Sequence, residues 1–112
     1  MKLFLNKIAE YTGGKVYGDG KSVVTYAAID SRKAKENSLF VALKGEQFDG
    51  HEYVEMALEK GAKGAVISDE KVFNKLEKKY ADLSCDVQPK IFLVEDTLVA
   101  LGQIANGYRR RF

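Results

Sequence analysis

Hydrophobic residues follow two patterns along the chain, and each pattern predicts a different kind of element. Continuous apolar runs of strand length occupy residues 39–43, 65–67 and 91–94. Such runs are typical of strands that are buried on both faces of a sheet. Apolar residues recur at helical spacing over 51–60, over 70–80 and from 96 onward. Because strands and helices alternate, the pattern predicts an α/β fold with parallel crossovers.

The first third of the chain adds shorter elements. Leu5, Ile8 and Ala9 predict a helix over about 3–11, which ends before Gly13. Residues 15–17 and 23–29 are β-prone, and a Gly-Asp-Gly turn at 18–20 separates them. We therefore predict a small three-layer domain over 1–112. Its mixed, mostly parallel sheet has about five strands flanked by helices, and the first two strands can pair antiparallel to the rest.

Details of two helices follow from the same patterns. Asp49 is a plausible N-cap for the 51–60 helix, with Glu52 three residues on, and Gly61 supplies its C-terminal stop. Asp96 or Thr97 caps the final helix. Its predicted inward face consists of Leu98, Leu101, Ile104, Ala105 and Tyr108.

Composition narrows the function classes. The 112 residues are 46% hydrophobic and 30% charged, with a net charge of +2. This balance argues against nucleic acid and anionic membranes as partners, and no apolar run reaches the roughly 20 residues of a membrane span. The N-terminus lacks a long apolar signal region, so we expect a cytoplasmic protein. One cysteine and one histidine exclude a disulfide framework and a cysteine- or histidine-rich metal site.

The first candidate site follows the 23–29 strand, where ligands bind in open α/β sheets. Arg32 offers a planar fork of donors suited to phosphate, and the Ser31 hydroxyl can bond the same kind of oxygen. Asp30 can orient Arg32 or accept a hydrogen bond from a sugar hydroxyl. The alternative is a simple strand-end turn held by an Asp30–Arg32 salt bridge, and the spacing alone favours it.

The second candidate site is the polar loop from Lys44 to Glu52, which leads into a helix N-terminus. Free backbone N–H groups there favour anions. Gly50 allows a ligand to approach the backbone, and His51 can bond a base or a ribose. The alternative is a capped helix start with a solvated histidine. Together the two clusters suggest one anionic or nucleotide-like ligand.

Three other features give weaker evidence of a functional site. Residues 14–22 end like a phosphate-binding P-loop, but the first glycine is one position too early and a strand follows, so we interpret them as a turn. Cys85 lacks an activating neighbour and is interpreted as an incidental thiol. Arg109–Arg111 close a helix, where cations are favourable. They leave RNA or protein binding only as a remote alternative.

Motifs across nearly the whole chain resemble a known family. They are Asp30-Ser31-Arg32, the run Leu39 to Glu46, Phe48-Asp49-Gly50-His51, Gly61-Ala62 and Val94 to Leu98. In this order and spacing they resemble the N-terminal domain of the Mur ligases of peptidoglycan synthesis. The run Lys44-Gly45-Glu46 with Phe48-Asp49 looks more like the members that add D-alanyl-D-alanine than the sister members that add the third amino acid.

The resemblance implies a domain that binds the UDP end of a UDP-N-acetylmuramoyl-peptide. It places Ser31 and Arg32 near the diphosphate and ribose, Asp49, Gly50 and His51 near the uridine, and Lys44 and Gln47 at the rim. It implies no catalytic residue, metal or cofactor in this chain. ATP and magnesium are expected in a central domain, and the amino acid or dipeptide in a C-terminal domain, which would continue past Phe112. We therefore expect this segment alone to be inactive. A standalone α/β binding module remains the alternative.

Overall fold

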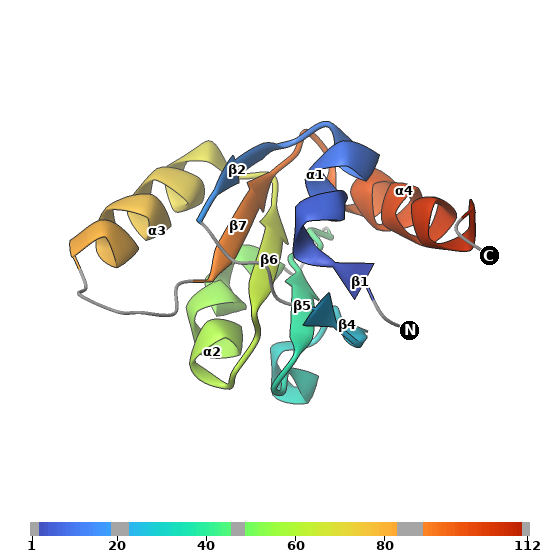
Figure 1. Ribbon diagram of the computed structural model, residues 1–112. Coiled ribbons are helices and arrows are strands. Elements are labelled where there is room, and N and C mark those ends of the chain that lie inside the picture. Colours follow the sequence, from blue (N-terminus) through green and yellow to red (C-terminus); the bar gives the residue numbers. More distant parts are fainter. Residues whose placement is uncertain (1–2, 19–22, 46–48, 83–88, 111–112) are drawn as a thin grey trace.

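The main sheet has five strands and places the carboxyl ends of four of them at one edge (Figure 1). The computed structural model describes residues 3–18, 23–45, 49–82 and 89–110. The strand order is β2-β7-β6-β5-β4, and only β2 runs antiparallel to its neighbour. The strands are β2 (Lys15–Tyr17), β4 (Tyr26–Ala28), β5 (Ser38–Val41), β6 (Gly64–Ile67) and β7 (Lys90–Leu93). The predicted mixed, mostly parallel sheet is confirmed.

Helices cover both faces of this sheet, which confirms the three layers (Figure 1). Helices α1 (Leu5–Thr12) and α4 (Thr97–Arg110) share one hydrophobic core with the sheet. Helices α2 (Val54–Glu59) and α3 (Glu70–Asp82) share the other. Two short 3-10 helices, η1 (Ser31–Lys33) and η2 (Gly50–Tyr53), follow β4 and β5.

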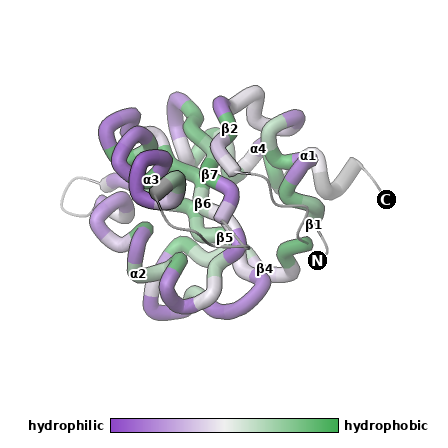
Figure 2. Tube along the Cα trace, turned by 60° about the vertical axis from the view of Figure 1, so that its left-hand side comes forward, coloured by the Kyte–Doolittle hydropathy of each residue, from purple (hydrophilic) through white to green (hydrophobic). Residues whose placement is uncertain are grey.

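The apolar runs of the sequence form the strands in the middle of the sheet because their alternate side chains enter opposite cores. In β5, Leu39 and Val41 face the α1–α4 core, whereas Phe40 faces the α2–α3 core, and all three are 0% exposed. Figure 2 shows these strands as the hydrophobic interior and the exposed turns of α3 as hydrophilic. The predicted burial of these strands on both faces is confirmed.

The predicted strand over 23–29 is wrong as a single element. It is divided into β3 (Val23–Val24), which pairs with β1 (Leu3–Phe4) in a separate two-stranded sheet, and β4 of the main sheet. Between them, the Thr25 backbone N–H donates to the carbonyl of Asn37 at 2.9 Å. The pairing with β1 also explains why the first helix begins at Leu5 rather than at residue 3.

The predicted helix over 51–60 starts differently. Asp49 is its N-cap as expected, but its carboxylate accepts the N–H of His51, two residues on, and the chain first turns as η2. Regular α-helix begins only at Val54. The last helix does begin at Thr97, after Asp96 caps the N–H groups of Leu98 and Val99 at 2.9 and 3.2 Å.

The predicted inward face of α4 is partly wrong. Leu98 is 65% exposed and Ala105 is also exposed, whereas Ile104 is buried as predicted. The buried stripe consists of Thr97, Ala100, Ile104 and Gly107. Gly107 leaves room for Tyr11 of α1 to pack against α4, since a Cβ there would lie 2.5 Å from the Tyr11 ring. The structure describes only the backbone of Tyr108, Arg109 and Arg110, and Cys85, Arg111 and the Asp19–Gly20 part of the predicted turn lie outside the described residues.

Candidate functional site

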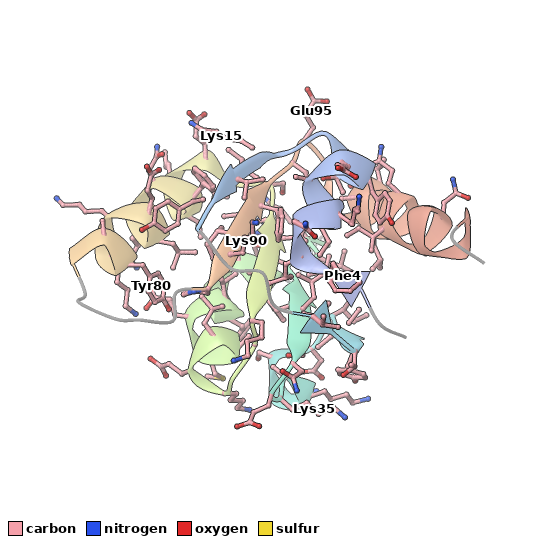
Figure 3. All side chains as sticks on the ribbon, in the orientation of Figure 1. Phe4, Lys15, Lys35, Tyr80, Lys90 and Glu95 are labelled. Atoms are coloured by element: carbon pink, nitrogen blue, oxygen red, sulfur yellow. The ribbon has the colours of Figure 1, made fainter. Side chains whose placement is uncertain are left out.

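A groove lies where the four parallel strands end. We call it the carboxyl-edge groove, and it is lined by Ile29, Leu43, Lys44, Gly45, Ser68, Glu95, Asp96, Thr97 and Leu98. Its volume is about 570 Å³, a size that suits a small-molecule ligand. Figure 3 shows Glu95 projecting from this edge of the sheet, while Lys35, which precedes β5, lies at the opposite edge. The groove is therefore at the place where ligands bind in open α/β sheets.

Among its described lining residues, the carboxyl-edge groove combines an apolar wall with one cation and two acidic residues, Glu95 and Asp96. Ile29 is 48% exposed and Leu98 is 65% exposed, and both line the groove with Leu43. Lys44 is the cation. Exposed apolar side chains beside convergent polar groups are a common feature of ligand sites. The arrangement can bind a flat, weakly polar group against the wall and an anion beside Lys44.

A second groove continues from the first and is more acidic, because three acidic residues and no lysine or arginine are among its described lining residues. It shares Ser68, Glu95 and Asp96 with the carboxyl-edge groove and extends between the ends of α1 and α4 past Glu70. Three acidic residues in its lining disfavour an anion. An anionic group of a ligand is therefore better placed at the Lys44 end.

The first predicted cluster forms a closed ion pair. The Asp30 carboxylate accepts from the Arg32 backbone N–H at 2.9 Å and from Arg32 Nη2 at 2.8 Å, and Nε lies 3.1 Å from Oδ1. The hydrogen-bonded Arg32 side chain, with the Arg32 backbone N–H, lowers the pKa of the Asp30 carboxyl to about 2. The Asp30–Arg32 salt bridge, which the sequence offered as the alternative to a ligand site, is thus present. The Arg32 side chain remains 84% exposed, so its contact with a phosphate stays a prediction.

Ser31 faces away from solvent. It is 6% exposed, and its hydroxyl lies 3.8 Å from the sulfur of Met56 in α2. Neither Ser31 nor Arg32 lines the carboxyl-edge groove, because the chain leaves the groove after Ile29 and packs η1 beside α2. Their predicted role at a diphosphate is therefore not supported by a shared cavity.

The His51 ring is held inside the protein by hydrogen bonds at both of its nitrogens, and the Ser68 Oγ also lies 3.4 Å from Nε2. Its Nδ1 lies 2.6 Å from Asp49 Oδ1, and its Nε2 accepts the backbone N–H of Ser68 at 2.9 Å. Since Nε2 accepts, the ring proton is on Nδ1, which donates to Asp49. The side chain is 4% exposed. The alternative interpretation, a capped helix start with a solvated histidine, is therefore wrong as regards the solvation of His51. Both ring nitrogens already have protein partners.

Asp49 and Gly50 have structural roles around His51. Burial by itself would raise the pKa of the Asp49 carboxyl, but the backbone and ring N–H groups of His51 and the nearby Lys44 hold it below its ordinary value. The Gly50 N–H donates to the Leu43 carbonyl at 2.7 Å. A Cβ on Gly50 would lie 2.9 Å from that oxygen. The space beside Gly50 is thus occupied by the backbone of Ala42 and Leu43, which directly follow β5, rather than being left for a ligand.

Among the predicted site residues, Lys44 is the one that lines the carboxyl-edge groove. Asp49 and His51 line a smaller cleft between η2, α2 and α3 instead. Gln47 lies outside the described residues. Sequence reasoning missed Ser68, Glu95, Asp96 and Thr97 as lining residues. The signal was available, since these residues directly follow the buried strands β6 and β7.

Comparison with known proteins supplies the family. Residues 23–109 match the family described as Mur ligase family, catalytic domain. The chain belongs to the Mur ligase family. The expected resemblance to Mur ligases is confirmed, and it includes the segment from β3 through α4.

Curated Mur ligases match nearly the whole chain. UDP-N-acetylmuramoyl-tripeptide–D-alanyl-D-alanine ligase of Haemophilus influenzae is 32% identical over 99% of this chain, and that of Bacillus subtilis is 37% identical over 96%. A Bacteroides thetaiotaomicron ligase named for 2,6-diaminopimelate is 40% identical over 49% of the chain. The chain spans about a fifth of the length of the first two relatives, 21% and 22%.

Solved Mur ligase structures share the fold. MurF from Acinetobacter baumannii superposes with a TM-score of 0.75 at 24% identity, covering 99% of this chain and 22% of that one. MurF from Thermotoga maritima in complex with ADP superposes with a TM-score of 0.58 at 27% identity, covering 80% of this chain and 18% of that one. The predicted α/β architecture is therefore that of a known Mur ligase domain.

No helix among the described residues is long and apolar enough to cross a membrane. Within the same part of the chain, no group of three or more His, Cys, Asp or Glu residues is arranged to hold a metal ion.

Proposed function

We propose that this chain is the N-terminal, substrate-binding domain of a Mur ligase and binds the UDP end of UDP-N-acetylmuramoyl-tripeptide. The longer ligase would add D-alanyl-D-alanine to that substrate with ATP. The observation that carries the proposal is the carboxyl-edge groove, in a chain that matches such ligases over 96–99% of its length.

The groove fits a nucleoside diphosphate in two respects. Ile29, Leu43 and Leu98 offer an apolar wall for the uracil ring. Lys44 offers an ammonium group for the diphosphate. The diphosphate would lie at the Lys44 end because Glu95 and Asp96 line both grooves and Glu70 adds a third acidic residue to the neighbouring one. Arg32 does not line the groove, but it follows the lining residue Ile29 by three positions and is exposed. We propose that its guanidinium binds phosphate from beside the groove while Asp30 orients it.

The chemistry of the ligase is assigned to regions outside this chain. We place ATP and magnesium in a central domain and D-alanyl-D-alanine in a C-terminal domain. ATP would supply activation of the peptide carboxylate as an acyl phosphate, which the amine then attacks. The residues of this chain would bind and orient the UDP end, so we propose that this segment alone catalyses no ligation.

A second candidate is the same domain of the ligase that adds the third amino acid. Relatives named for diaminopimelate match, but over 49–80% of the chain. The wider coverage by the D-alanyl-D-alanine ligases favours the first candidate. Assaying a full-length ligase that carries this segment with each amine would distinguish them: ligation of diaminopimelate and not of D-alanyl-D-alanine would establish the second.

The direct test is an NMR titration of the labelled chain with UDP-N-acetylmuramoyl-tripeptide, with UMP and ATP as comparison ligands. We expect shifts at Lys44, Ser68 and Leu98 with the UDP compound and not with ATP. Lys44→Ala should weaken binding about tenfold, since it removes a charge-assisted contact. Lys60→Ala is the matched control, because this exposed lysine ends α2 and does not line the groove.

The failure of this test is equally specific. Equal binding of ATP and the UDP compound would show a general nucleotide module rather than a UDP-substrate domain. Absence of shifts, both in this chain and in a full-length ligase that carries it, would overturn the proposed site.

A further inference from the structure

We infer that His51 is a positioning residue for the carboxyl-edge groove: it fixes the Ser68 peptide relative to the end of β5. This inference deepens the proposed function and rests on it for the identity of the ligand. It differs from the role predicted from the sequence, in which the His51 ring contacts the ligand itself.

Residues from the ends of two neighbouring strands line the groove. Leu43 and Lys44 line it from the end of β5, and Ser68 lines it from the end of β6. Beyond Ile67, however, Ser68 has left the strand. Its backbone N–H donates to His51 Nε2 at 2.9 Å instead of to the sheet, and its Oγ lies 3.4 Å from the same nitrogen. The orientation of this peptide at the groove therefore depends on a side chain.

His51 is itself tied to the other side of the groove. Its Nδ1 donates to Asp49, whose backbone pairs with Lys44 in an isolated antiparallel bridge. The Gly50 N–H donates to the Leu43 carbonyl at 2.7 Å. A chain of short hydrogen bonds thus runs from Leu43 and Lys44 through Asp49 and His51 to Ser68.

Burial makes this connection rigid. The His51 side chain is 4% exposed, so water competes poorly for its two nitrogens. Each nitrogen serves a different element, with Nδ1 on the β5 side and Nε2 on the β6 side. Losing the Nε2 contact would free the Ser68 peptide, whereas losing the Nδ1 contact would leave Ser68 held.

Two amide variants separate these contacts. In His51→Gln, Oε1 reaches the place of Nε2 and can accept the Ser68 N–H, but the donor to Asp49 is lost. In His51→Asn, Nδ2 reaches the place of Nδ1 and can donate to Asp49, but the acceptor for Ser68 is lost. Each variant removes one hydrogen bond and is the control for the other.

The experiment measures three quantities in wild type and both variants. They are the free energy of unfolding, the hydrogen-exchange rate of the Ser68 amide, and the affinity for UDP-N-acetylmuramoyl-tripeptide. We expect both variants to lose similar stability. We expect His51→Asn alone to exchange the Ser68 amide about tenfold faster and to bind the UDP compound about tenfold more weakly, the effect of one hydrogen bond.

The outcomes are distinct. Affinity that falls equally in both variants, in step with stability, would overturn the positioning role and leave a structural one. Unchanged Ser68 exchange in His51→Asn would overturn it as well. If the wild-type chain and a full-length ligase carrying it do not bind the UDP compound, the proposed function fails. The faster Ser68 exchange confined to His51→Asn would then still support the fixing of the Ser68 peptide by His51.

Discussion

The turns that follow the neighbouring parallel strands β4 and β5 have the same local hydrogen-bond pattern. They nevertheless expose their basic residue to very different extents. In Asp30-Ser31-Arg32 and in Asp49-Gly50-His51, the aspartate accepts the backbone N–H two residues on, at 2.9 and 3.0 Å. In both, it also binds the side chain of that residue, and a 3-10 helix follows. Yet the Arg32 side chain is 84% exposed and that of His51 is 4% exposed.

The shared hydrogen-bond motif of the two turns therefore does not determine what the basic residue does. Within the part of the chain that the structure describes, the Arg32 side chain is hydrogen-bonded to Asp30, and the side chain is 84% exposed. His51 has two partners on different elements, because the ring is directed toward the end of β6. The exposed guanidinium of Arg32 is available to a ligand. The buried His51 ring, whose two nitrogens are both hydrogen-bonded, can affect the site only by holding the residues around it in place.

The largest expected effect separates the two basic residues by stability. His51→Ala should lower the free energy of unfolding by about 3 kcal/mol, because it leaves a cavity and an unpaired Ser68 N–H. Arg32→Ala should leave it nearly unchanged, since exposed ion pairs contribute little. Urea unfolding of both variants measures this. Equal losses would contradict the contrast between a buried and an exposed turn.

The middle residues of the two turns provide the next test. Gly50→Ala should destabilise the fold by about 2 kcal/mol, since its Cβ would collide with the backbone of Leu43. Gly102→Ala is the control, because nothing lies within 4 Å of a Cβ there, and in a helix this change should stabilise by about 1 kcal/mol. Thermal unfolding of both variants checks the signs. A neutral Gly50→Ala would show that β5 and η2 can separate freely.

A smaller effect concerns ligand binding at the exposed turn. Arg32→Ala should weaken binding of UDP-N-acetylmuramoyl-tripeptide about tenfold, if the guanidinium makes a charge-assisted bond to phosphate. The fold should persist. Calorimetric titration of the variant measures the affinity, with Lys33→Ala as a control of equal charge change in the same turn. Unchanged affinity in Arg32→Ala would assign the Asp30–Arg32 pair a purely structural role.

The smallest effect is electrostatic. The pKa of the Asp30 carboxyl is about 2 instead of 3.8, chiefly through its hydrogen bonds to Arg32. The stability from this lowered pKa is therefore present above about pH 4 and is lost as the pH falls through about 2. Arg32→Ala should raise the pKa of Asp30 toward 3.8, as measured by carboxyl NMR. The lowered pKa of Asp49, which depends on His51, should stay unchanged and serves as the internal control.

Much of the fold could be predicted because its strongest determinants are local. The apolar runs at β5, β6 and β7 are continuous, and the stripe on α3 is regular, so their placement follows from burial alone. The same patterns failed for residues 23–29 and for the face of α4. In those segments pairing with distant partners decides the outcome, namely β1 for Val23–Val24 and Tyr11 for Gly107.

The amino-acid sequence alone was enough to predict the α/β architecture, the caps at Asp49 and Asp96, the Asp30–Arg32 salt bridge as one of two alternatives, and the resemblance to Mur ligases. These depend on periodicity and on contacts within a few residues. Which side chains line one groove depends on the tertiary structure. It joined Lys44 to Ser68, Thr97 and Leu98, and it enclosed His51. The physical reason is that exposure and hydrogen-bond partners depend on which elements pack together, and residues far apart in sequence supply those partners.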